Sequence, residues 1–241
     1  MKIIVTKNYD EMSREAAKCF SEVIANKPEC VLGLATGSTP VGMYEYLIED
    51  YKNGKIDFAA VRSVNLDEYY PISPDNDQSY RYFMNENLFK SVNIKIENTK
   101  VPNGEAKDVE KECAEYEAYI DSLGGVDIQV LGIGRNGHIG FNEPDSELNP
   151  FTHLTALTPN TIEANARFFE KEEDVPKHAL TMGIKSVFKA RKIVILASGE
   201  GKAEAIKGML GNITTSCPAS LLCLHPDVTL ICDEAAYSLC K

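Results

Sequence analysis

Short runs rich in β-branched residues alternate with longer amphipathic segments along most of the chain, and this alternation limits the possible folds more than any other feature. The runs expected to form strands span residues 2–5, 30–35, 61–66, 127–133, 192–197 and 228–232. The segments expected to form helices span residues 10–25, 41–51, 78–89 and 109–123, with a further helix from Gly201. Such alternation predicts an α/β fold in which helices cover both faces of a mostly parallel sheet.

The length and composition are typical of one large globular domain. A chain of 241 residues buries a substantial core without crosslinks, and we find no linker, repeat or low-complexity tract. Acidic residues outnumber basic ones, 36 to 25, and the net charge of -11 argues against binding to nucleic acid. The first apolar run is too short for a signal peptide or a membrane span, so we expect a cytoplasmic protein with no membrane partner.

The seven cysteines give no functional signal. They form no CxxC pair, and their odd number does not suggest a disulfide framework, so we assign none of them a catalytic role.

In open α/β sheets, ligands bind beyond the carboxyl ends of the strands, so the loops after the predicted strands are the candidate sites. Thr36, Gly37, Ser38 and Thr39 follow one strand and open a helix, where free amide groups attract an anion. A purely structural turn explains this loop equally well. The loop 198–202 repeats the arrangement with Lys202 at its end, and two such loops together favour a phosphate ligand.

Two further loops carry groups suited to proton transfer. Asp67 directly follows a predicted strand and has the position of a general base, although a helix-capping or turn role is the more common one for such a residue. His138 lies between two glycines, and Glu143 follows five residues later, so the carboxylate is placed to hold the imidazole in one tautomer. With four histidines and no metal-ligand spacing, we expect no zinc or other metal site.

Together these loops resemble the glucosamine-6-phosphate deaminase family, over nearly the whole chain. The string GIGRNGHIGFNEP at 132–144 carries most of the resemblance, and NLDEYY at 65–70 supports it. The related 6-phosphogluconolactonases share a Gly-His motif, but the FNEP and NLDEY segments match the deaminase pattern. The resemblance implies a Rossmann-like three-layer sandwich with a doubly wound sheet, and conversion of glucosamine 6-phosphate to fructose 6-phosphate and ammonia without a cofactor.

The resemblance also implies roles for individual residues. Asp67 corresponds to the base for enolisation, and Asn136, His138 and Glu143 correspond to the ring-opening residues, although some relatives carry Asp at the position of Asn136. The residues that correspond to the phosphate and substrate site are Thr36, Gly37, Ser38, Thr39, Gly137, Arg167 and Lys202. The segment near 160–180 corresponds to an active-site lid, whereas its charge pattern alone fits a solvated surface equally well.

Two further expectations concern assembly and alternatives. Regulated hexameric relatives carry cations where this chain has His153 and Thr155, and this chain ends soon after its last predicted strand, so the resemblance implies a monomer with hyperbolic kinetics. A sugar-phosphate sensor is the competing class, because the same fold serves some transcriptional regulators. The absence of a basic helical segment before residue 2 and the presence of acid–base residues favour the enzyme.

Overall fold

The computed structural model describes residues 1–158, 162 and 175–240. A seven-stranded sheet forms its centre, and all the strand pairs in this sheet are parallel. In spatial order its strands are β1 (Lys2–Thr6), β10 (Val228–Asp233), β9 (Lys192–Ala197), β6 (Ile128–Gly132), β2 (Val31–Leu34), β3 (Arg62–Asn65) and β5 (Thr99–Lys100). The predicted parallel sheet is therefore confirmed. The sequence pattern missed β5, because two residues are too few to show a periodicity.

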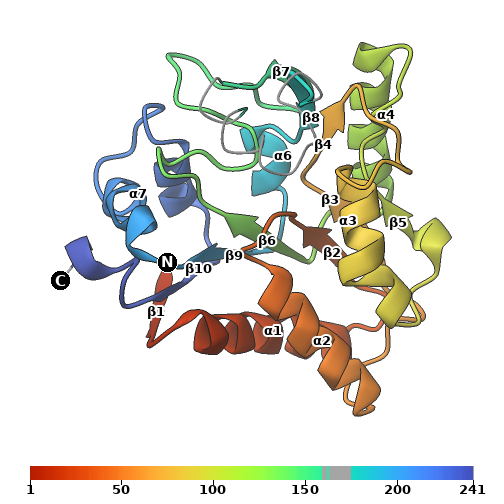
Figure 1. The fold of residues 1–241 in the computed structure, drawn as a ribbon, viewed down its shortest axis with the longest axis horizontal. Coiled ribbons are helices and arrows are strands. Elements are labelled where there is room, and N and C mark those ends of the chain that lie inside the picture. The colour runs from red at the N-terminus through yellow and green to blue at the C-terminus, as the bar shows by residue number, and fades with distance from the viewer. Residues whose placement is uncertain (159–161, 163–174, 241) are drawn as a thin grey trace.

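Helices cover both faces of this sheet, as predicted. Helices α1 (Tyr9–Asn26) and α2 (Val41–Lys52) pack against each other on one face, while α4 (Val109–Ser122), α6 (Ile184–Phe188) and α7 (Ala203–Met209) lie on the other (Figure 1). In α1, Met12, Ala16, Phe20 and Ile24 recur every fourth residue and are buried, which is the expected pattern for a helix packed on a sheet. None of the described helices is long and apolar enough to cross a membrane.

The remaining helices are short. Helix α3 (Tyr80–Asn87) begins after Ser79, whose hydroxyl accepts a hydrogen bond from the backbone N–H of Tyr82 at 2.9 Å, and ends earlier than the predicted segment 78–89. The 3-10 helices are η1 (Phe89–Ser91), η2 (Ile96–Asn98), η4 (Glu200–Lys202), η5 (Pro218–Leu224) and η6 (Ser238–Cys240).

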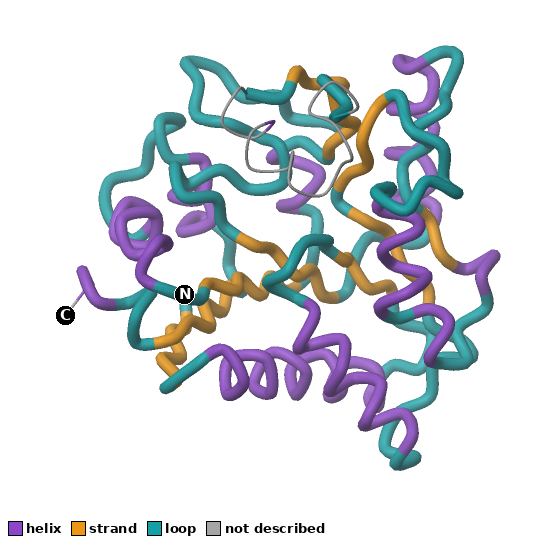
Figure 2. The backbone as a smooth tube through the Cα atoms, viewed as in Figure 1, coloured by secondary structure: helices purple, strands orange, loops and turns teal. Residues whose placement is uncertain are grey.

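A second, antiparallel sheet was not predicted. It consists of β4 (Asp67–Tyr70), β8 (His178–Thr181) and β7 (His153–Ala156), in that order. In Figure 2 these strands lie apart from the row of central strands and are joined to it by loops. The sequence interpretation treated 65–70 as a loop. It failed because each of these strands has only four residues and is ordered by partners that are distant in sequence.

The strand order places a binding crevice at a defined point. From β2 the chain proceeds outward to β3 and β5, then returns to the other side of β2 to form β6, β9 and β10. The order therefore reverses between β2 and β6, and in doubly wound sheets ligands bind at such a switch point, beyond the carboxyl ends of the strands. Strand β1 adds an outer edge next to β10.

Candidate active site

A cleft of about 1280 Å³ opens at this switch point. Its walls come from the loops after four adjacent strands, namely β9, β6, β2 and β3. Among the residues predicted to form the site, those that line the cleft are Thr36, Ser38, Thr39, Asp67, Asn136, His138 and Lys202. Gly37, Gly137 and Glu143 do not line it but lie beside residues that do. Arg167 and most of the predicted lid at 160–180 fall outside the described residues.

Asp67 lies at the bottom of the cleft as the first residue of β4. Its side chain forms no hydrogen bond with any residue that the structure describes, and only 6% of the residue is exposed. Burial, followed by the neighbouring Glu68 charge, raises the pKa of Asp67 to about 8. A buried carboxyl with an elevated pKa that faces a cleft is the arrangement expected of a general base.

Glu68 points away from Asp67 and has a different role. Its carboxylate accepts backbone N–H groups of Tyr69 at 2.9 Å, Tyr80 at 2.8 Å and Arg81 at 2.9 Å. The last two belong to the first turn of α3, so Glu68 fixes that helix end to β4. The capping role considered for Asp67 therefore belongs to Glu68, and burial raises the pKa of Glu68 to about 7 despite these three hydrogen bonds.

His138, Glu143 and Asn136 form one hydrogen-bonded group on the loop after β6. His138 Nδ1 lies 3.0 Å from Glu143 Oε2, and Asn136 Nδ2 donates to the same oxygen at 2.6 Å. The His138 backbone N–H also donates to Asn136 Oδ1 at 3.3 Å. Because Nδ1–H faces the Glu143 carboxylate, Nε2 carries the lone pair and is available to exchange a proton.

Glycines allow this loop to fold tightly. The His138 ring lies over Gly134, where an added Cβ would be 2.4 Å from its Nε2. Gly137 has a φ of +84°, and a Cβ there would be 2.5 Å from Cys217 Sγ, so Gly137 faces the protein interior rather than the cleft.

Gly140 allows the loop that carries His138 to approach Asp67 closely. A Cβ on Gly140 would be 3.4 Å from Asp67 Oδ2 and 2.9 Å from Thr181 Oγ1, and that hydroxyl accepts the Phe141 backbone N–H at 3.1 Å. Thr181 is also the strand partner of Asp67. The second sheet therefore connects the Asp67 segment to the His138 loop.

The loop at 36–39 forms the wall after β2 and leads into α2. The backbone N–H groups of Thr36, Gly37, Ser38 and Thr39 have no acceptor among the described residues. Tyr9 braces the loop, because its hydroxyl donates to Ser38 O and accepts the Gly42 N–H, both at 2.9 Å. Free amides at a helix start suit a phosphate.

The loop at 198–202 differs from its prediction as a second amide cradle. The Gly199 N–H lies 3.0 Å from both carboxylate oxygens of Asp233, and the Ser198 hydroxyl donates to the same carboxylate. The amide of Gly199 is therefore occupied within the protein. Lys202 remains on the cleft wall, where its Nζ donates to Ile133 O at 2.6 Å. Burial, with a smaller contribution from Arg135, lowers the pKa of Lys202.

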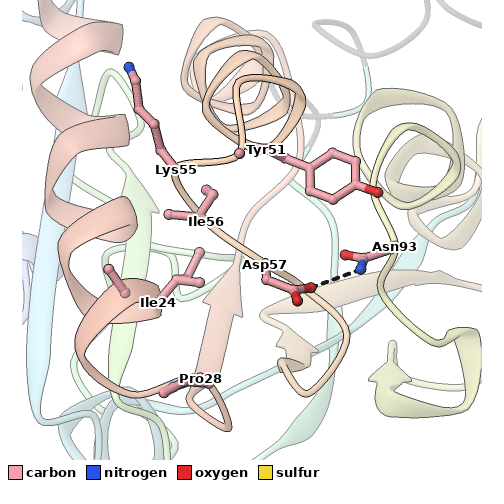
Figure 3. Close-up of a pocket in the computed structure, with 9 residues that line it drawn as sticks. Ile24, Pro28, Tyr51, Lys55, Ile56, Asp57 and Asn93 are labelled. Carbon is pink, nitrogen blue, oxygen red and sulfur yellow. Dashed lines mark hydrogen bonds between the residues drawn. The ribbon is translucent and has the colours of Figure 1, made fainter.

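A second cavity, of about 460 Å³, lies between the carboxyl-terminal ends of α1 and α2 and contains none of the predicted site residues (Figure 3). Its polar groups bond to neighbours: Asn93 Nδ2 donates to Asp57 Oδ1 at 2.8 Å, and Lys55 Nζ donates to Asp50 Oδ1 at 2.7 Å. No group of His, Cys, Asp or Glu side chains within the described ranges has the arrangement of a metal site.

The fold and the site thus define an α/β protein with acid–base groups next to a loop whose amide groups face no described acceptor. Residues 6–231 match the family model described as glucosamine-6-phosphate isomerases/6-phosphogluconolactonase. This chain belongs to that family.

Two curated relatives are particularly similar to this chain. A glucosamine-6-phosphate deaminase of Clostridium perfringens is 59% identical over 242 residues, covering 100% of both chains. The enzyme of that name from Clostridioides difficile is 58% identical over 239 residues, which cover 99% of this chain and 96% of the relative.

Solved structures agree with this placement. The structure of a monomeric glucosamine-6-phosphate deaminase superposes with a TM-score of 0.96 at 47% identity, covering 99% of this chain and 100% of the other. A 6-phosphogluconolactonase from Thermotoga maritima superposes with a TM-score of 0.76 at 21% identity, covering 96% and 98%, and at that identity it shows the fold alone.

Proposed function

We propose that this chain is a glucosamine-6-phosphate deaminase, which isomerises D-glucosamine 6-phosphate and releases D-fructose 6-phosphate and ammonia in amino-sugar breakdown. The observation that carries the proposal is the juxtaposition, across one cleft, of the buried Asp67 carboxyl and the His138–Glu143 pair. The full-length identity to the named deaminases supports the same reaction.

In the first step His138 opens the sugar ring. Its Nε2 takes the proton of the anomeric hydroxyl and returns a proton to the ring oxygen, so the C1–O5 bond breaks and the aldehyde forms. Glu143 stabilises the imidazolium that forms in between, and Asn136 keeps the Glu143 carboxylate in place. Because the reaction consists of proton transfers and a hydrolysis, the proposal includes no cofactor and no metal.

In the second step Asp67 moves a proton between two carbons. Its carboxylate removes the proton from carbon 2, the aldehyde oxygen is protonated to give an enolamine, and the same carboxyl returns the proton to carbon 1. Water then adds to the resulting ketimine at carbon 2, and the C–N bond breaks to release ammonia. General acid–base steps of this kind typically contribute about 10²–10⁴-fold each.

The substrate itself prepares Asp67 for this role. With a pKa of about 8, Asp67 is largely protonated at neutral pH. A substrate ammonium group next to it favours the ionised form and lowers that pKa. Binding of the amino sugar therefore generates the base at the place where it is needed.

The phosphate group is assigned to the loops after β2 and β9. We assign it to Thr36, Gly37, Ser38 and Thr39, to Lys202, and to Arg167 from the segment near 160–180, which acts as a lid over the bound sugar. Gly137 is included because its left-handed backbone conformation shapes the loop that carries His138. The exposed N–H groups at 36–39 and the Lys202 ammonium support it, since both attract a phosphate.

The domain organisation, assembly and partners of the chain also belong to the proposal. We infer a single catalytic domain over 1–241 that works as a cytoplasmic monomer, binds no nucleic acid and acts on a small sugar phosphate. The 47% identity to the structure named as a monomeric deaminase supports the monomer, and the net charge of -11 opposes nucleic-acid binding.

A colorimetric ammonia assay with glucosamine 6-phosphate tests the function. We expect stoichiometric release of ammonia and fructose 6-phosphate. Binding of the sugar phosphate without turnover would instead identify a sensor, and hydrolysis of 6-phosphogluconolactone without ammonia release from the amino sugar would identify a lactonase.

A further inference from the structure

Two cations lie side by side on one wall of the cleft. Arg135 belongs to the loop after β6, and Lys202 ends η4 after β9. The Arg135 guanidinium packs against the segment that carries Lys202, since a Cβ built on Gly201 would be 3.6 Å from Arg135 Nε and 4.0 Å from its Cζ. Arg135 also contributes to the lowered pKa of Lys202 by charge repulsion, so the two charges act on each other.

Neither cation is neutralised by a described carboxylate. Neither Arg135 nor Lys202 forms an ion pair with any acidic residue in the described part of the chain, although the chain holds 36 such residues. The hydrogen bond of Lys202 to Ile133 O uses one of its three ammonium protons. The exposed Arg135 lines the cleft, and its guanidinium forms no hydrogen bond with any residue that the structure describes. Two like charges in one wall, neither of them paired with a described carboxylate, favour an anion with more than one negative charge.

The position of this pair relative to Asp67 indicates which part of the substrate it meets. Lys202 follows β9 and Asp67 follows β3, and β6 and β2 lie between these strands. The Lys202 Nζ donates to Ile133 O directly after β6, so its charge lies two strand spacings from β3, or roughly 10 Å at about 4.8 Å per strand. A cation pair next to Asp67 would repel the substrate ammonium, whereas at the far end it meets the group most distant from carbon 2, which is the phosphate.

We propose that Arg135 is a binding residue for the substrate phosphate and that, together with Lys202, it selects the doubly ionised phosphate group. This rests on the proposed function, and it adds a specificity residue that the sequence interpretation did not include. The planar guanidinium donates two parallel hydrogen bonds to two phosphate oxygens, while Lys202 supplies a point charge to the third. The second pKa of a phosphate monoester is about 6, so the dianion prevails at neutral pH.

Substitution of Arg135 tests the proposal through its selectivity. We expect Arg135→Gln to raise KM for glucosamine 6-phosphate on the order of tenfold, because an exposed charged hydrogen-bonding group is lost. The loss should appear in KM more than in kcat, and kcat/KM for unphosphorylated glucosamine should fall much less. Arg135→Lys should lie between the wild type and the Gln variant. As matched control, Arg62→Gln removes a partly exposed guanidinium at the opposite end of β3 and should leave both substrates unaffected.

Binding of inorganic phosphate provides a readout that does not need turnover. Phosphate should raise the Tm of the wild type in proportion to ln(1 + [phosphate]/Kd), and the Arg135→Gln variant should need about tenfold more phosphate for the same shift. Equal phosphate titrations for the wild type and the Gln variant, or equal losses with phosphorylated and unphosphorylated sugar, would overturn the proposal. A wild type that binds phosphate but releases no ammonia would contradict the proposed function and leave this test intact.

Discussion

At the scale of single residues, Asp67 and Glu68 show how neighbours in sequence take opposite roles. Both are buried acids on β4, but only Glu68 has backbone donors around its carboxylate. Asp67 faces the cleft without such donors, and its pKa rises to about 8. The surroundings of the Asp67 carboxyl therefore destabilise its ionised form relative to its protonated form, and such raised pKa values are common among catalytic groups.

The first prediction concerns Asp67→Asn. We expect ammonia release and exchange of the carbon-2 proton with solvent to fall together by about 10²–10⁴-fold, since both need the same base. Proton exchange is measured by NMR in D₂O, and Asp75→Asn, which changes an exposed carboxyl, is the control. A variant that retained most of its activity would show that Asp67 is not the base.

The same substitution should change the pH dependence of stability. Between the unfolded pKa of about 3.9 and the folded pKa of about 8, the folded protein holds a proton that the unfolded chain has lost. The free energy of unfolding therefore falls as the pH rises through this window. Asp67→Asn removes this loss, so in urea titrations its stability advantage over the wild type should be larger at pH 8 than at pH 5.

The second prediction separates ring opening from proton transfer between carbons. His138→Gln should reduce turnover of cyclic glucosamine 6-phosphate about 10²-fold or more. In the presence of ammonia, which converts the open-chain ketone of fructose 6-phosphate to the ketimine with loss of water, exchange of the carbon-1 protons should be reduced much less because that step uses Asp67. Equal losses in the two assays would argue against a ring-opening role for His138.

At the scale of elements, the loops after β2 and β6 each contain a glycine with a left-handed backbone conformation, but only the glycine after β6 is also closely packed. Gly37 and Gly137 both have positive φ, at +88° and +84°. Open space surrounds the Cβ position of Gly37, whereas Cys217 Sγ lies 2.5 Å from that of Gly137. The two glycines therefore allow the cost of backbone strain to be separated from the cost of a steric clash.

The third prediction uses this pair. Gly37→Ala should lower the free energy of unfolding by about 1–2 kcal/mol, from the left-handed conformation alone. Gly137→Ala should lower it by a further 1–3 kcal/mol or so, because the new methyl group displaces Cys217. Urea titration measures both, and Cys217→Ala in the Gly137→Ala background should restore part of the difference. Equal costs for the two alanine variants would contradict the packing argument.

At the scale of the whole molecule, the second sheet connects the proposed catalytic residues of distant segments. β4 carries Asp67, β8 pairs with it, and Thr181 of β8 bonds to the backbone of Phe141 on the loop that holds His138. The site is thus assembled by contacts between strands rather than within one segment. β7, the outer strand of this sheet, carries His153 and Thr155 and has no Lys or Arg.

The fourth prediction concerns assembly and kinetics. Cooperativity requires an effector site with different affinities in two states. The resemblance implies that regulated relatives carry cations at the positions of His153 and Thr155. We therefore expect hyperbolic saturation by glucosamine 6-phosphate, unchanged by N-acetylglucosamine 6-phosphate. Analytical ultracentrifugation should give the monomer mass of 26.6 kDa. Sigmoidal saturation that the acetylated sugar phosphate makes hyperbolic would refute this expectation.

The sequence by itself determined the central strands, most of the helices and the loops that line the cleft. Periodicity records which side of a segment is buried, and this local property predicted six of the strands in the parallel sheet to within about two residues. The motif around His138 also predicted its pairing with Glu143, which lies only five positions further along the same loop.

Only the tertiary structure decided which distant residues meet. Three such contacts depend on strand order. Asp67 pairs with Thr181, and Glu68 accepts hydrogen bonds from the first turn of α3. Arg135 lies close to Gly201 and Lys202. Hydrophobic periodicity contains no information about strand order, because it indicates which residues of a segment are buried but not which other segment packs against them. The burial that raises the pKa of Asp67 and the occupation of the Gly199 amide by Asp233 arise in the same way, from segments that come together only when the sheet forms.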